Sequence, residues 1–394
     1  MTTLADFYDL MNGTTTLRRM LVEYYLAGTV KVEEVAGLRR ALDVLEEQRT
    51  ADGRFEFRTK PDGRRTRVAL DYETQELEKD LFFFEHGEEA FHRYVADRTP
   101  GLDTDIRAVT DLLRPTGDAT FVSDRDGTVN NYCGRYRSSV QSTYNAVFLT
   151  RFLRRRTGRS AILTSAPLED FGIVDLTVMP TEGMILAGSK GREFTDEAGR
   201  RHSLPIEADK QTQLTELNNR LSLLLERPEY EEFGLIGSAL QQKFGQTTVA
   251  RQDIYGSIDP ERSEAFLERI RALVAELDPA GETFRIEDTG YDIEIILTRA
   301  QGDRDFNKGD GIDFMNREAG LDLDGPVVVC GDTPSDLPMA ERAARTSTDL
   351  RTVFVTRDDE LRRRVEEIAP QSVFVGTPDA LVLAVGALGK EEAL

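Results

Sequence analysis

The stretch ATFVSDRDGT, residues 119–128, runs from an apolar segment into a polar loop that carries two aspartates. A short apolar run of this kind is typical of a buried parallel strand, whose carboxyl end is where open α/β sheets bind ligands. Asp124 and Asp126 stand two residues apart, so on an extended segment both carboxylates face the same side. One can attack while the other handles a proton. Taken alone, the same motif also fits a tight turn with two solvated acids.

Further apolar runs alternate with helical stretches after this point, as in βαβ units. The segment 138–158 has helical apolar spacing and a terminal arginine cluster, followed by Gly158 as a helix stop. The sequence therefore predicts an α/β fold with a Rossmann-like, doubly wound parallel sheet. The expected strands are SAILT (160–164), PVVVC (326–330), TVFVT (352–356) and SVFVG (372–376).

Two regions do not show this alternation of apolar runs and helical stretches. Residues 1–115 are predicted to form a mostly helical accessory region. Within it, the stretch 52–74, which contains two Asp-Gly pairs, could form a β-hairpin instead. Residues 206–300 contain two amphipathic segments, 211–226 and 263–277, and strand-like runs at 246–256 and 292–298, enough for an inserted α+β domain. The core is therefore expected in two parts, 116–205 and 301–394.

The composition limits the classes of partner. The 71 acidic and 50 basic residues give a formal charge of −21, which repels nucleic acid and anionic membranes. No run approaches the roughly 20 apolar residues of a membrane span, and the first residues lack a signal-peptide layout, so a cytoplasmic protein is expected. The two cysteines, Cys133 and Cys330, fit neither a disulfide framework nor a zinc site.

Three more polar positions follow apolar runs or open a helix. Thr164 ends the second predicted strand, although a threonine there is often only a helix cap. Lys308, one of 8 lysines, precedes an apolar helix start, where a solvated lysine is the simpler interpretation. Asp332 and Asp336 follow the run PVVVC. Carboxylates gathered at one sheet edge repel one another unless a cation is present, which predicts a hard divalent ion such as Mg²⁺.

Taken in order, DRDGT, the strand-end threonine, the lysine and GDTPSD resemble the four signature motifs of the haloacid dehalogenase superfamily. The resemblance covers residues 115–394. It implies that Asp124 attacks phosphorus and becomes an aspartyl phosphate, while Asp126 protonates the leaving oxygen and later activates water. It further implies that Thr164 binds the phosphoryl oxygens and that Lys308 offsets their charge.

The same resemblance implies a magnesium site. Asp332 would hold the ion together with Asp124 and the carbonyl of Asp126, and Asp336 would support the ion or orient Lys308. Phosphoryl transfer depends mostly on positioning and charge neutralisation, which a metal ion and a lysine supply together.

The insertion resembles the large cap of trehalose-phosphate phosphatases. LQQKFGQTTVARQD and GYDIEIIL correspond to cap segments of that family, which implies Lys243 and Glu294 as ligands of sugar hydroxyls. The loop 129–136 lies where the family places a flap, so Arg135 is expected to meet an anion; a polar loop capping the next helix is the alternative.

Three positions depart from the family pattern. Ser165-Ala166-Pro167 replaces Gly-Arg after Thr164, Gln241 or Gln242 replaces an acid, and ARQD (250–253) replaces an aromatic-rich strand. The predicted function is Mg²⁺-dependent hydrolysis of a sugar phosphate such as trehalose 6-phosphate. Another sugar or glycosyl compatible-solute phosphate, a phosphomutase and a degenerate regulatory module remain as alternatives.

Overall fold

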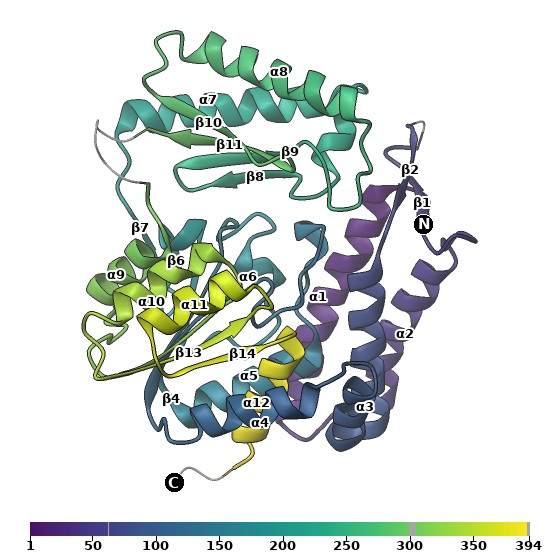
Figure 1. Ribbon diagram of the computed structural model, residues 1–394. Helices are drawn as coiled ribbons and strands as arrows, with labels where there is room; N and C mark the ends of the chain where they lie inside the picture. Colours follow the sequence, from purple (N-terminus) through teal and green to yellow (C-terminus); the bar gives the residue numbers. More distant parts are fainter. Residues whose placement is uncertain (62, 299–304, 392–394) are drawn as a thin grey trace.

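The computed structural model describes residues 1–61, 63–298 and 305–391, and three regions are visible in it (Figure 1). N-terminal helices stand beside a central sheet with its own helices, and a layer of strands and helices covers one end of that sheet. The predicted fold class is therefore confirmed. The boundaries at residues 115, 205 and 300 stay predictions. Residue 300 lies outside the described residues, as do 301–304 and 392–394 of the second predicted core segment.

The central sheet has eight strands in the order β14-β13-β12-β3-β4-β5-β6-β7. The first six strands of this order are parallel, and β6 and β7 add an antiparallel edge. All five predicted strands lie in it. The bounds are β3 (Ala119–Asp124), β4 (Thr157–Leu163), β5 (Ile185–Gly188), β6 (Glu193–Thr195), β7 (Arg201–Ser203), β12 (Pro326–Gly331), β13 (Asp349–Val355) and β14 (Ser372–Val375).

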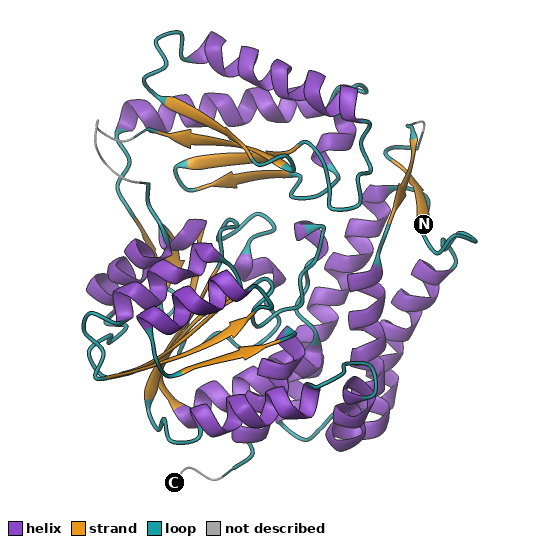
Figure 2. Cartoon of the chain, in the orientation of Figure 1, coloured by secondary structure: helices purple, strands orange, loops and turns teal. Residues whose placement is uncertain are grey.

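Helices cover both faces of this sheet, as Figure 2 shows. On one face lie α4 (Leu102–Leu113), α5 (Thr143–Arg156) and α12 (Pro378–Leu388), which share one apolar cluster with the sheet. On the other lie α9 (Lys308–Ala319), α10 (Leu337–Ala343) and α11 (Asp359–Ile368). The chain winds from β3 through β4 to β5 in one direction and through β12 to β14 in the other. The switch point between β3 and β12 is where a doubly wound sheet binds its ligand.

The connection from α5 to β4 differs from the expected helix stop. The helix ends at Arg156 and β4 begins at the next residue, so Gly158 is inside the strand and not at a helix C-cap. A Cβ at Gly158 would lie 2.8 Å from the carbonyl oxygen of Asp118. The glycine is therefore explained by close backbone approach between β4 and the residue before β3.

The insertion forms a four-stranded antiparallel sheet in the order β10-β11-β9-β8, packed against two helices. We call this unit the cap, because it covers the carboxyl ends of the central strands (Figure 1). The predicted strand at 246–256 ends earlier, at Ala250. The bounds are α7 (Ala208–Leu225), β8 (Leu240–Lys243), β9 (Gln246–Ala250), α8 (Pro260–Leu277), β10 (Phe284–Asp288) and β11 (Asp292–Leu297), with the short helix η3 (Glu231–Gly234) between α7 and β8.

The N-terminal region consists of α1 (Leu4–Leu26), α2 (Val32–Glu46) and α3 (Asp71–Ala96), followed by α4. The hairpin alternative is the one that the structure adopts, with β1 (Phe55–Arg58) antiparallel to β2 (Arg65–Val68). The region also contacts the cap: the Tyr8 hydroxyl donates to the Leu235 carbonyl at 2.5 Å, and Lys60 Nζ lies 2.9 Å from Glu231 Oε2. It therefore touches both of the other regions.

A buried ion pair fastens the N-terminal helices to the core. Arg18 Nε on α1 donates to Asp80 Oδ2 on α3 at 2.7 Å, and both side chains are fully buried. The other Asp80 oxygen accepts the backbone N–H of Thr143 at 2.7 Å, the first residue of α5. Burial raises the pKa of Asp80 to about 6, against the effect of Arg18. Asp80 thus satisfies an orphan donor at the start of a core helix.

Asp80→Ala should lower the free energy of unfolding by roughly 3–5 kcal/mol, because it leaves the Arg18 guanidinium buried without its partner. Glu85→Ala is the matched control on the same helix, since Glu85 pairs with Arg39 at 2.6 Å on the surface; it should cost less than about 1 kcal/mol. Urea denaturation measures both. Equal losses would show that the buried pair is not what fastens the regions.

Candidate active site

Four chain segments converge at the switch point of the central sheet. Asp124 is the last residue of β3, Thr164 directly follows β4, and Asp332 directly follows β12. Lys308 is the first residue of α9, whose start is fixed by Asn307, because the Asn307 side chain accepts the N–H of Asp310 at 3.1 Å. The structure therefore brings the residues of all four predicted motifs to one edge of the sheet.

Three carboxylates form an acidic cluster at this edge. Oxygen atoms of Asp124, Asp332 and Asp336 all lie within 4.8 Å of one another. Burial, with the charges of the other two, raises the pKa of Asp332 to about 9. Burial likewise raises the pKa of Asp124 to about 7, although Lys308 acts against it. The cluster therefore carries more negative charge than its surroundings balance, and its all-oxygen donor set fits a hard divalent cation.

Lys308 is the cation within the cluster. Its Nζ lies 2.5 Å from Asp124 Oδ1 and 2.5 Å from Asp336 Oδ1. Burial alone would lower the pKa of Lys308, but the two carboxylates outweigh it and raise the pKa. Asp336 Oδ2 accepts the N–H groups of Asp332 and Thr333, both at 3.0 Å. Since both of its oxygens are engaged, Asp336 orients Lys308 and the loop after β12.

Two glycines keep this edge open. A Cβ on Gly127 would lie 2.2 Å from Asp332 Oδ2, and the φ of Gly127 is +89°. A Cβ on Gly331 would lie 2.5 Å from the Cβ of Asp336, at a position with no unusual φ. Both approaches are closer than real side chains allow, so the acidic cluster needs glycine at each place.

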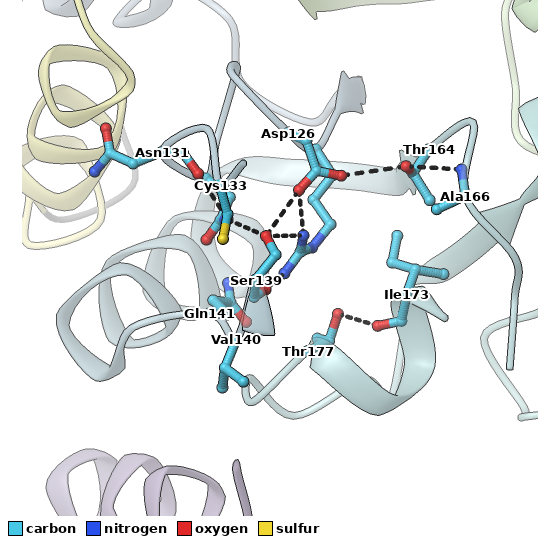
Figure 3. Close-up of polar contacts among 12 residues, drawn as sticks. Asp126, Asn131, Cys133, Ser139, Val140, Gln141, Thr164, Ala166, Ile173 and Thr177 are labelled. Carbon is cyan, nitrogen blue, oxygen red and sulfur yellow. Dashed lines mark hydrogen bonds and ion pairs between the residues drawn. The ribbon is translucent and has the colours of Figure 1, made fainter. Parts of the chain in front are cut away.

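Asp126 lies beside the cluster with its carboxyl held by other groups (Figure 3). Its Oδ2 accepts from the Thr164 hydroxyl at 3.2 Å, and its Oδ1 accepts from the Ser139 hydroxyl at 3.1 Å and from the Arg125 guanidinium. The carboxyl thus has a defined orientation next to Asp124, which suits a group that moves a proton. Metal contact through the Asp126 carbonyl stays a prediction.

A cavity of about 350 Å³ opens above these residues, between core and cap. Lys243 of β8 and Glu294 of β11 line it together with Asp124 and Asp126, so the predicted cap residues face the same space as the predicted catalytic residues. Burial lowers the pKa of Lys243, with Glu294 and Asp292 acting in the opposite direction. Of the two glutamines that depart from the family pattern, Gln241 lines the cavity, while Gln242 is exposed.

The predicted flap does lie beside this cavity, since Tyr132 and Tyr136 line it. Arg135 is not among the residues that line the cavity, and it is 1% exposed. Its guanidinium nitrogens lie 3.3 and 3.4 Å from Asp253 Oδ2 in the loop after β9. The pair joins flap and cap, and an anion-binding role for Arg135 stays a prediction.

Sequence reasoning did not single out Arg125 or Ser139, whereas Tyr136 belongs to the predicted flap. Arg125 is buried and donates to both Asp126 and the Ser139 carbonyl. Burial, with the charge of Asp126, raises the pKa of Tyr136, so its phenol stays protonated and can donate in the cavity. The available signal was the position of Arg125 between the two predicted catalytic aspartates, where a basic side chain can pair locally.

Comparison with known proteins agrees with this geometry. The family described as trehalose-6-phosphate phosphatase, C-terminal, matches residues 121–381, and the N-terminal helical bundle domain of the same enzyme matches residues 3–102. The chain belongs to the trehalose-6-phosphate phosphatase family. The predicted resemblance to phosphatases of the haloacid dehalogenase type is thereby confirmed, and it extends to the N-terminal third, which the motif comparison had left outside. No helix among the described residues is long and apolar enough to cross a membrane.

Curated relatives include longer and similar-sized proteins. The chain is 30% identical to alpha,alpha-trehalose-phosphate synthase [UDP-forming] 2 of Caenorhabditis elegans, over 97% of this chain but 33% of that protein, so it spans about a third of that relative. It is 29% identical to a trehalose-phosphatase of Caenorhabditis briggsae, over 95% and 94% of the two chains. A solved trehalose-6-phosphate phosphatase of Aspergillus fumigatus aligns with a TM-score of 0.40 and 16% identity, over 73% of this chain and 98% of that one.

Asp332→Asn should stabilise the protein in the absence of divalent ions, because an amide at this position requires neither a negative charge in the cluster nor the uptake of a proton on folding. The folded-state pKa of Asp332, about 9, lies above its ordinary value of 3.8, so wild-type stability falls as the pH rises between these values. At pH 8 in chelator we expect the variant to gain on the order of 1–2 kcal/mol, and at pH 5 much less.

Thermal unfolding with and without Mg²⁺ measures this effect. Magnesium should raise the Tm of the wild type and leave the variant unchanged. Asp324→Asn, which removes an exposed carboxylate before β12, should match the wild type throughout. An equal response to Mg²⁺ in the wild type and Asp332→Asn would contradict a cation site at Asp332.

Proposed function

We propose that the protein is a magnesium-dependent phosphatase that hydrolyses a sugar phosphate, with trehalose 6-phosphate as the expected substrate, through an aspartyl phosphate on Asp124. The observation that carries the proposal is the position of Asp124. Its carboxylate belongs to the acidic cluster, contacts Lys308 and lines the cavity between core and cap. A nucleophile held against a lysine and a cation site is what phosphoryl transfer requires.

In the first half-reaction, a carboxylate oxygen of Asp124 bonds to phosphorus while the bond from phosphorus to the sugar oxygen breaks. Asp126 gives its proton to that oxygen, so the sugar leaves as an alcohol. Lys308 balances the charge on Asp124 and on the phosphoryl oxygens, and Thr164 donates to one of them. A divalent ion held by Asp124, Asp332 and the Asp126 carbonyl supplies further neutralisation when bound.

In the second half-reaction, Asp126 takes a proton from water. The water oxygen bonds to phosphorus, and the bond from phosphorus to Asp124 breaks. Inorganic phosphate leaves, and both aspartates return to their starting states. Dividing the hydrolysis in this way replaces one difficult displacement by two easier ones.

The polar cap lining supports a sugar as the leaving group. Lys243 is 8% exposed and is accompanied in the lining by Gln241, Asp292 and Glu294, which together offer donors and acceptors for hydroxyl groups. The names of the similar-sized relatives favour trehalose 6-phosphate. Gln241 or Gln242 stands where the family has an acid, which makes another sugar or glycosyl compatible-solute phosphate the second candidate. The contacts of Asp124 and Asp336 with Lys308 argue against a degenerate regulatory module. A phosphatase releases inorganic phosphate, whereas a phosphomutase does not, so measured phosphate release would distinguish the two.

Asp124→Asn should lower phosphate release at least roughly 10³-fold, because an amide of the same size cannot form the aspartyl phosphate. The measurement is phosphate release from a panel of sugar phosphates with Mg²⁺, beside thermal unfolding to verify the fold. Asp118→Asn is the matched control: it is exposed at the opposite end of β3, with a φ of +56° that asparagine adopts readily. Substantial turnover by folded Asp124→Asn would contradict the nucleophile.

Lys243→Ala and Glu294→Ala should each lower kcat/KM for the preferred sugar phosphate about 10- to 100-fold, since each removes a charged hydrogen-bonding group. On para-nitrophenyl phosphate, which has no sugar hydroxyls, the loss should be several-fold smaller. Gln242 lies between Gln241 and Lys243, which line the cavity, but is itself exposed. Gln242→Ala therefore serves as the control. Equal losses on both substrates would mean that these residues act in folding or cap motion and not in sugar recognition.

A further inference from the structure

The cap side of the active-site cavity carries charged groups that the chemical step does not use. Among the described residues, three carboxylates of the cap line this cavity, those of Asp253, Asp292 and Glu294, and the basic residue of the cap beside them is Lys243. Lys308 and the acidic cluster lie at the core end, where the phosphate is expected. The balance of charge at the cap therefore acts on the part of the substrate that lies away from the phosphate.

Asp253 adds no unbalanced charge, because its carboxylate is engaged within the protein. Its Oδ2 accepts from the Arg135 guanidinium at 3.3 and 3.4 Å, and its Oδ1 accepts two backbone N–H groups of its own loop, both at 3.0 Å. The ion pair with Arg135 is buried on both sides. Asp292 and Glu294 therefore stand against Lys243, which leaves two negative charges and one positive charge on the cap wall.

The strand β11 places Asp292 and Glu294 on one face of the cap sheet. Successive side chains of a strand point to opposite faces, and the alternate residues Ile293 and Ile295 are buried in the apolar cluster of the cap. The backbone N–H of Asp292 also donates to the Thr289 hydroxyl at 2.9 Å, in the turn that precedes the strand. The fold of the cap therefore fixes where the Asp292 carboxylate meets the cavity.

The Asp292 carboxylate has unused capacity to accept hydrogen bonds. Its Oδ2 accepts from the Ser238 hydroxyl at 3.1 Å, whereas its Oδ1 has no hydrogen-bond partner among the described residues. Burial raises the pKa of Asp292, while the charge of Lys243 and the bond from Ser238 act in the opposite direction. A carboxylate only accepts hydrogen bonds, so it attracts a hydroxyl group and repels a second anion.

We infer that Asp292 is a specificity-determining residue which, together with Glu294, admits an uncharged, hydroxyl-bearing end of the substrate to the cap and disfavours an end with a second anionic group. The inference rests on the proposed function and deepens it, because it concerns the part of the phosphate ester that the core does not bind. Like charges repel most strongly where water is excluded. Among the candidate substrates, a neutral disaccharide phosphate is therefore favoured over a glycosyl phosphate that also carries a carboxylate.

The test uses two esters that differ only in charge at the end remote from the phosphate. Glucitol 6-phosphate ends in a CH₂OH group, and 6-phosphogluconate ends in a carboxylate at the same position. Each is measured as a competitive inhibitor of para-nitrophenyl phosphate hydrolysis with Mg²⁺, so the ratio of the two Ki values does not depend on how fast either ester is turned over. We expect the wild type to bind glucitol 6-phosphate at least about tenfold more tightly than 6-phosphogluconate.

Two variants should move this ratio in opposite directions. Asp292→Asn keeps the size of the side chain and removes its negative charge, so the preference for glucitol 6-phosphate should shrink several-fold. Lys243→Ala removes the cation that opposes Asp292 and Glu294, so it should weaken 6-phosphogluconate more than glucitol 6-phosphate and enlarge the preference. A purely structural effect on the cap would weaken both inhibitors together and leave the ratio unchanged.

Glu287→Gln is the matched control for the loss of one negative charge. Glu287 stands opposite Glu294 in the register of β10 and β11, so it lies on the same face of the sheet, but it is exposed and does not line the cavity. Water screens such a charge, and the ratio should stay within about twofold of the wild type.

Equal Ki values in the wild type would overturn the inference, as would a ratio that Asp292→Asn leaves unchanged or that Glu287→Gln shifts equally. Failure of the proposed function is recognised separately. If the wild type releases phosphate from para-nitrophenyl phosphate but from no sugar phosphate, the substrate assignment falls, while the Ki ratio still decides the role of Asp292. If it releases phosphate from no ester with Mg²⁺, the proposed function falls, and the inference falls with it.

Discussion

The sharing of one buried lysine by two carboxylates governs the arrangement of this protein. Lys308 Nζ lies 2.5 Å from both Asp124 and Asp336, while Asp332 adds a third carboxylate within 4.8 Å. Three carboxylates gathered beside one lysine repel one another, which favours the binding of a cation among them. The contact requires β3 and β12 to be neighbours and α9 to begin at their carboxyl ends. The sheet order, the winding around the switch point and the position of the cap all serve that contact.

The N-terminal region is in contact with the core, the cap and the flap. Asp80 of α3 accepts the first N–H of α5, the Tyr8 hydroxyl of α1 donates to the cap, and the Tyr72 hydroxyl of α3 accepts from Asn130 of the flap. One helical bundle therefore holds the core, the cap and the flap in register. The match of residues 3–102 to the helical bundle domain of the family is consistent with this integration.

The sequence predicted the features that local pattern encodes. The five apolar runs became five parallel strands, and the motif residues met at one edge because parallel strands place their carboxyl ends together. Strands β5 to β7 were not predicted, since they are four, three and three residues long. The partner of Arg135 could not be read from the sequence either, because Asp253 is 118 positions away. Likewise, nothing in the local pattern of Asp292 shows that its carboxylate meets Ser238, 54 positions away.

The close approach at Gly331 limits how sequences of this kind can diverge. A methyl group there would overlap the side chain of Asp336, while the backbone angle itself suits any residue. The restriction is therefore one of volume and not of conformation. A sequence that replaces Gly331 must also change or move the side chain of Asp336, which contacts Lys308. Drift at either position is consequently tied to drift at the other, and the pair can change only together.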